Sequence, residues 1–232
     1  MRSTKFGQLG AMVMEAYPDA CEQTVVLLHG YGAPGTDLIT LGSEIATPKK
    51  TRFVFLQAPH VLPGMTGPFA GRAWWEINML ELQIISMTQN YDLLAASHPS
   101  GLDEATTLLS EALEQLVTTT HCSWEQLYVG GFSQGAMLSC NWALHSAHAV
   151  SGLIQLSGTL ICQEEWKQLV QRKHGLRVFQ SHSPDDQVLP FALAERLKKL
   201  FVESGQNHTW LKFSGGHGIS PQVLTALGQF LG

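Results

Sequence analysis

One short segment constrains the fold of this chain more than any other. Residues 131–135 read Gly-Phe-Ser-Gln-Gly, the only Gly-x-Ser-x-Gly match in the sequence. The apolar run 127–129 before it predicts a strand, and residues 136–145 after it predict a helix. A serine at such a sharp strand-to-helix turn needs flanking glycines, because a Cβ there would strike neighbouring elements. The motif is typical of an exposed nucleophile; the alternative is a Gly-rich turn whose serine caps the helix.

Strand-like and helix-like segments alternate along the rest of the chain. Continuous apolar runs, as at residues 25–28, are typical of strands buried on both faces of a parallel sheet. Further strands are predicted at 53–56, 153–156, 177–180 and 209–213, with an edge strand within 7–16 and a turn at 17–19. Helices are predicted at 37–46, 102–116, 164–172, 191–202 and 221–230. We therefore expect an α/β fold in one domain over residues 1–232: a mostly parallel central sheet with helices on both faces.

Residues 60–101 interrupt this alternation. They contain prolines and glycines and show no clean periodicity, and a long irregular segment inside a compact domain is usually functional. We expect a lid-like insertion on the substrate side. Its large apolar residues Trp74, Trp75, Met79 and Leu82 are predicted to line or cover an apolar acyl pocket. Ordinary core packing under a long loop is the alternative.

Polar residues follow the predicted strands in an order that suits acyl transfer. Ligands of such sheets bind beyond the C-terminal ends of the strands. Ser133, Asp186 and His217 each follow a strand, in the chain order of an α/β-hydrolase triad. His217 would take the serine proton and later return it to the leaving group, while Asp186 would orient the imidazole. Asp185 is the alternative acid.

The tetrahedral intermediate of such a reaction needs N–H donors for its oxyanion. In this fold they come from the residue after the nucleophile and from an early loop, here the backbone N–H groups of Gln134 and Tyr31. His29, beside that loop, is expected to brace it by hydrogen bonding. The other histidines outside helices are assigned to the surface or to loops: His60, His98, His121, His174, His182 and His208.

Several classes of function are disfavoured. The chain has no P-loop, Gly-x-Gly-x-x-Gly or Cys-x-x-Cys pattern, and no third ligand accompanies His145 and His148, so neither a cofactor nor a metal is predicted. Basic residues are scattered and the net charge is −5, so no nucleic-acid partner is expected. No apolar run approaches the ~20 residues that span a bilayer, so stable membrane insertion is not expected. The four widely spaced cysteines are interpreted as reduced packing residues of a cytoplasmic protein.

Six segments together resemble the phospholipase/carboxylesterase family of α/β-hydrolases, which includes acyl-protein thioesterases. They are residues 28–32, 57–59, 72–76, 131–136, 186–190 and 216–219. The family acid lies four residues before a proline that opens a helix, which matches Asp186 and Pro190 and not Asp185. The resemblance implies the α/β-hydrolase fold without a large separate cap domain and without a cofactor. Family members are often homodimers.

These observations predict a cytoplasmic carboxylesterase, a serine hydrolase that cleaves carboxylic esters through an acyl-enzyme on Ser133. Small-molecule esters with short to medium acyl chains are the favoured substrates. The alternative with the same chemistry is an acyl-protein thioesterase, which acts on thioesters, or a lysophospholipase. A remote alternative from another class is an inactive hydrolase fold that acts as a binding protein.

Overall fold

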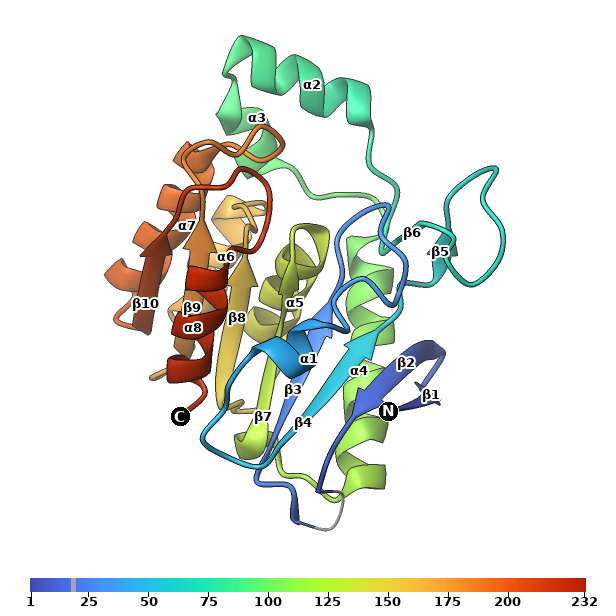
Figure 1. Cartoon of the computed structure of the whole chain (residues 1–232). Helices are drawn as coiled ribbons and strands as arrows, with labels where there is room; N and C mark the ends of the chain where they lie inside the picture. The colour runs from blue at the N-terminus through green and yellow to red at the C-terminus, as the bar shows by residue number, and fades with distance from the viewer. Residues whose placement is uncertain (18–19) are drawn as a thin grey trace.

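An eight-stranded sheet forms the centre of the molecule (Figure 1). The structure, a computed structural model, describes residues 1–17 and 20–232, apart from the side chains of Met79, Glu81 and Ser86. In spatial order the strands are β1 (Arg2–Phe6), β2 (Leu9–Met14), β4 (Thr51–Leu56), β3 (Gln23–Leu28), β7 (Leu127–Phe132), β8 (Gly152–Leu156), β9 (Arg177–His182) and β10 (Asn207–Lys212). The pairs β1–β2 and β2–β4 are antiparallel. All other neighbours in this sheet are parallel.

Helices cover both faces of the sheet. On one face lie α4 (Leu102–Thr120), α5 (Gln134–His145), α6 (Gln163–Val170) and α7 (Phe191–Glu203), and on the other lie α1 (Leu41–Glu44) and α8 (Pro221–Phe230). Strand β3 is buried throughout, and its side chains alternate between the two cores: Val26 packs with the first set of helices and Val25 with the second. The predicted mostly parallel α/β sheet with helices on both faces is confirmed.

Three elements differ from the prediction. The edge strand predicted within 7–16 is β2, which lies inside the sheet between β1 and β4. Strand β1 was not predicted, because it is an edge strand whose first residues, including Arg2, are largely exposed and carry no apolar run. The helix predicted over 37–46 is reduced to the short α1, which is preceded by turns at residues 34–40. The turn predicted at 17–19 falls largely on residues 18 and 19, which lie outside the described part of the chain.

Residues 60–101 are more regular than expected. They contain a small antiparallel pair, β5 (His60–Val61) and β6 (Arg72–Ala73), and two helices, α2 (Met79–Thr88) and α3 (Tyr91–Ala96). Helix α2 gave no periodic signal because its apolar residues are not confined to one face: Leu80 is exposed and Ile85 is buried. Both helices stand beyond the C-terminal edge of the parallel strands (Figure 1). None of the described helices is long and apolar enough to cross a membrane.

Candidate active site

Ser133 occupies the sharp turn between β7 and α5. Its backbone has a positive φ, with φ 54° and ψ −117°, which is unfavourable for a residue with a side chain. The turn is held tightly against β3: a Cβ added to Gly131 would lie 2.5 Å from the carbonyl oxygen of Leu28, and one added to Gly135 would strike the same carbonyl. Only glycine fits at these two positions, so the strain is imposed by packing on both sides of the serine.

His217 joins Ser133 to Asp186. Its Nε2 lies 2.9 Å from the Oγ of Ser133, and its Nδ1 lies 2.7 Å from the Oδ2 of Asp186. The carboxylate accepts the Nδ1 proton, which leaves Nε2 of the neutral ring to accept a proton from the serine hydroxyl. The structure therefore brings Asp186 to the imidazole, and Asp185 makes no such contact. Ser157 holds the loop that carries His217, because its hydroxyl donates to the carbonyl of Gly218, at 3.0 Å.

The Asp186 carboxylate is fully buried but well supplied with donors. Its Oδ1 accepts the backbone N–H groups of Val188 and Leu189, both at 2.8 Å. Burial alone would raise the pKa of this carboxyl group. The hydrogen bonds from His182, His217 and the Leu189 N–H outweigh burial and hold the pKa well below its ordinary range. Asp186 is therefore a carboxylate at any pH near neutrality.

His182 is a residue of this site that sequence reasoning missed. The expectation of a surface or loop position was wrong, since its side chain is completely buried. Its Nε2 lies 3.1 Å from the carbonyl oxygen of Leu189 and 3.2 Å from the Oδ2 of Asp186. Both partners are acceptors, so Nε2 carries the proton. The polar residues at 181–186 suggested that His182 lies in a loop. The signal that could have found it is its position four residues before Asp186.

The loop after β3 lies against Ser133. A Cβ on Gly30 would approach the Cβ of Ser133 to 3.2 Å, and Tyr31 lines the pocket that contains the serine. His29 holds the loop: its Nδ1 donates to the Gly30 carbonyl (2.8 Å), and its Nε2 accepts the N–H of Ala58 (3.1 Å). Burial lowers the pKa of His29 to about 4, so the ring is neutral. These bonds confirm the expected bracing role of His29.

Trp74 and Trp75 have different environments. Trp74 is completely buried and is not among the residues that line the pocket. The expectation that it lines the pocket was therefore wrong. Its indole Nε1 donates to the carbonyl of His29 (2.9 Å), and its backbone N–H donates to the side-chain oxygen of Gln134 (3.0 Å). The Gln134 amide nitrogen in turn donates to the carbonyl of Trp75 (2.8 Å). The Gln134 side chain thus joins residues 74 and 75 to the start of α5.

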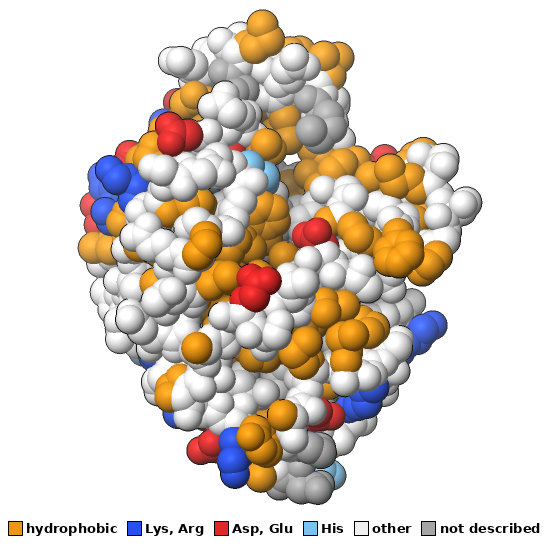
Figure 2. All heavy atoms as spheres, viewed as in Figure 1, with side chains coloured by type: hydrophobic (Ala, Val, Ile, Leu, Met, Phe, Trp, Pro, Cys, Tyr) orange, Lys and Arg blue, Asp and Glu red, His pale blue; other side chains and the backbone are white. Residues whose placement is uncertain are grey.

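An apolar pocket of about 580 Å³ opens beside Ser133 and His217. Trp75 and Leu82 line it as expected, and α2 and α3 contribute further apolar walls. The Met79 side chain, also expected there, lies outside the described part of the structure. Figure 2 shows apolar side chains gathered in the hollow below these two helices. The volume falls within the range of small-molecule sites, about 300–1,000 Å³.

The His145 and His148 pair does not converge on one point. His145 is hydrogen-bonded to Glu165, and His148 stacks on Trp124 with ring centroids 3.8 Å apart. Among the described residues, the side chains that could together hold a metal ion are His98, Cys162 and Glu165. No contact is recorded between these three side chains and those of Ser133, His217 and Asp186 in the described part of the chain, although His98 lines the same pocket as Ser133 and His217.

Comparisons with known proteins show which family the chain resembles. The family model for Phospholipase/Carboxylesterase matches residues 10–232. Acyl-protein thioesterase 1 of Eremothecium gossypii is 29% identical over 205 residues, covering 86% of this chain and 82% of the relative. Acyl-protein thioesterase 1 of Saccharomyces cerevisiae is 25% identical and covers 90% and 91%. The crystal structure of esterase PE8 aligns with a TM-score of 0.77 and 27% identity, covering 98% of each chain.

Proposed function

Because the chain belongs to the phospholipase/carboxylesterase family of α/β-hydrolases, we propose that it is a serine hydrolase that forms an acyl-enzyme on Ser133. The observation that carries this proposal is the hydrogen-bonded series from the Ser133 hydroxyl through His217 to Asp186. A serine hydroxyl is a weak nucleophile unless a neighbouring base takes its proton, and the series supplies that base. The remote alternative of an inactive binding protein does not require these contacts.

The reaction proceeds in two halves. His217 takes the proton of Ser133 as its oxygen attacks the acyl carbonyl, and then gives that proton to the departing alcohol or thiol. A water molecule, activated in the same way, releases the acid. The developing oxyanion is stabilised by the backbone N–H groups of Tyr31 and Gln134, each worth roughly 3 kcal/mol of the barrier. Gln134 opens α5, so its N–H also lies at the positive end of that helix.

Two substrate classes fit this chemistry. We favour carboxylic esters with short to medium acyl chains, and assign Trp75 and Leu82 to contacts with the acyl chain, because both line the apolar pocket. Acyl thioesters are the second class, supported by the relatives named acyl-protein thioesterase 1. Lysophospholipids share the same bond chemistry. A cytoplasmic location, a homodimer, the absence of nucleic-acid partners and a single domain over 1–232 stay predictions.

The test is a matched substrate series. Oxygen esters from acetyl to palmitoyl, the corresponding thioesters and a lysophospholipid are hydrolysed under one condition by the wild-type protein and by Ser133→Ala. We expect ester turnover that is highest for short or medium chains and absent in Ser133→Ala. A larger kcat/KM for thioesters of the same acyl group would assign the protein to the second class. Trp75→Ala or Leu82→Ala should change the chain-length preference; an unchanged profile would remove them from the acyl site.

A further inference from the structure

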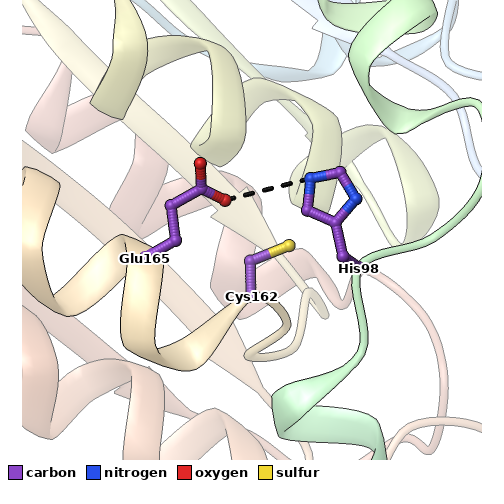
Figure 3. Close-up of side chains that lie close together, drawn as sticks. All are labelled: His98, Cys162 and Glu165. Carbon is purple, nitrogen blue, oxygen red and sulfur yellow. Dashed lines mark ion pairs between the residues drawn. The ribbon is translucent and has the colours of Figure 1, made fainter.

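A second cluster of reactive side chains lies where the segment between α3 and α4 meets the start of α6. His98 comes from that segment, and Cys162 and Glu165 come from the beginning of α6 (Figure 3). One potential ligand atom from each residue lies within 4.8 Å of the other two. The His98 Nε2 is 3.9 Å from the Glu165 Oε2. In Figure 3 the three side chains point toward one another.

The three side chains offer the ligand atoms that a divalent cation of intermediate softness prefers. An imidazole nitrogen, a thiolate sulfur and a carboxylate oxygen are the three ligand types that Zn²⁺ takes in proteins. Tetrahedral ligands at the usual zinc distances lie roughly 3.3–3.8 Å from one another. Separations within 4.8 Å therefore need contractions of up to about 1.5 Å, which side-chain rotation supplies because His98 and Glu165 are partly exposed.

The backbone already holds the two halves of the cluster together. The Cys162 N–H donates to the carbonyl of Ser97, at 2.9 Å, which joins the α6 start to the residue preceding His98. Cys162 itself has a left-handed backbone with φ 47°, a conformation that is strained in a residue with a side chain. The surrounding structure holds this conformation: the thiol lies 3.4 Å from the Ser97 carbonyl oxygen and points toward His98 (Figure 3).

Outer contacts support the ligands. His145 lies between two acceptors: its Nδ1 is 2.9 Å from the Asn141 carbonyl oxygen, and its Nε2 is 3.1 Å from the Glu165 Oε1. One oxygen of Glu165 thus contacts His145 while the other faces His98, and second contacts of this kind are common around metal-bound carboxylates. Asp103 places a carboxylate oxygen 3.3 Å from the His98 Nε2. The competing explanation without a metal is a protonated His98 paired with the two carboxylates.

We propose that His98, Cys162 and Glu165 form a zinc-binding site distinct from the hydrolytic centre. Asp103 or a water molecule would complete the tetrahedron, and the Cys162 thiol would release its proton on binding. His98 also lines the apolar pocket, so the ion would fix one wall of that pocket and connect the α3–α4 segment to α6. The site is structural in kind and does not depend on the proposed hydrolase activity.

The test uses the purified full chain and two metals. Zn²⁺ affinity is measured by competition with a chromogenic chelator, and Co²⁺ is added separately to detect the thiolate-to-cobalt absorption band. We expect one equivalent of metal and a thiolate band that Cys162→Ser removes. His98→Ala and Glu165→Gln, at partly exposed positions where folding is preserved, should weaken Zn²⁺ by about tenfold or more. Cys122→Ser and His174→Ala are the matched controls and should bind normally.

The possible outcomes separate this site from the hydrolytic centre. Zn²⁺ should raise the Tm of the wild-type protein and of Ser133→Ala alike, and at the same Zn²⁺ concentration should raise that of His98→Ala less. Metal binding that is unchanged in both His98→Ala and Glu165→Gln would overturn the proposal. So would loss of binding in Ser133→Ala, because the ion would then occupy the hydrolytic centre. The absence of any stoichiometric binding would favour the ion-pair explanation.

Discussion

At the scale of single residues, the most constrained group is the Asp186 carboxylate. Its two oxygens face four donors: the N–H groups of Val188 and Leu189, and the rings of His182 and His217. Such a set fixes both the orientation of the carboxylate and the tautomer of His217. We therefore expect Asp186 to contribute to catalysis through its negative charge and also by fixing the orientation of the His217 ring.

Asp186→Asn should lower kcat by roughly 10⁴-fold with little change in KM, because an amide can present an N–H to His217 and favour the wrong tautomer. Steady-state kinetics on the preferred ester checks this. Asp185→Asn is the matched control, since Asp185 makes no contact with the imidazole, and it should retain most of the activity. Equal losses in the two variants would contradict the assignment of Asp186.

The lowered pKa of Asp186 also predicts a pH dependence of stability. Its folded pKa lies below its ordinary value of 3.8, so the ionised group contributes stability above that value and loses the contribution as the pH falls toward the folded pKa. The difference in unfolding free energy between wild type and Asp186→Asn should therefore be constant from neutral pH to about pH 5 and shrink below it. Urea unfolding across this range measures the difference. A gap that widens in acid would mean that the pKa is raised.

At the scale of secondary-structure elements, the strand–turn–helix unit β7–α5 depends on close backbone contact with β3. Gly135→Ala would press a Cβ into the Leu28 carbonyl, which cannot move without shifting the strand. We expect a loss of about 1–3 kcal/mol in unfolding free energy, together with reduced activity. Gly10→Ala is a suitable control, because its added Cβ would meet chiefly the side-chain amide of Gln57, which can rotate. Similar losses in both variants would contradict this explanation.

The same elements explain what sequence reasoning could predict. Strands such as β3 were predictable because burial on both faces leaves a continuous apolar run. Ser133, Asp186 and His217 were predictable as a group because parallel strands bring their C-terminal ends to one edge of the sheet. Helix α2 was missed because its apolar residues follow no single face.

Side-chain environments were harder to predict than elements. Nothing in the spacing of Trp74 and Trp75 distinguishes the buried indole that donates to His29 from the residue that lines the pocket. The convergence of His98 and Cys162 depends on tertiary contacts between segments over sixty residues apart. Local sequence patterns carry no information on either arrangement.

At the scale of the whole molecule, the C-terminal helix is joined to the sheet by Arg177. Its guanidinium donates to the Tyr128 hydroxyl (2.9 Å) and to the Phe230 carbonyl (2.6 Å), and lies 4.7 Å from the centre of the Phe230 ring. Helix α8 follows the loop that carries His217, so this anchor stabilises the fold at a distance from the site. We therefore expect Arg177 to contribute to the stability of the fold and not to catalysis.

Arg177→Met keeps much of the aliphatic stem and removes the hydrogen bonds. We expect a loss of about 1–3 kcal/mol in unfolding free energy and a Tm lower by several degrees, with kcat per folded molecule unchanged. Thermal unfolding and active-site titration measure the two quantities separately. A large fall in kcat at unchanged stability would show that this contact acts on the site.

The central claim, that Ser133 is a nucleophile activated by His217, is tested most directly by covalent labelling with a fluorophosphonate. The folded protein is treated with the probe, digested and analysed by mass spectrometry, alongside Ser133→Ala and His217→Ala. We predict one adduct, on Ser133, absent from Ser133→Ala and formed far more slowly in His217→Ala. An adduct on another residue, or labelling of Ser133 at the same rate without His217, would contradict the claim.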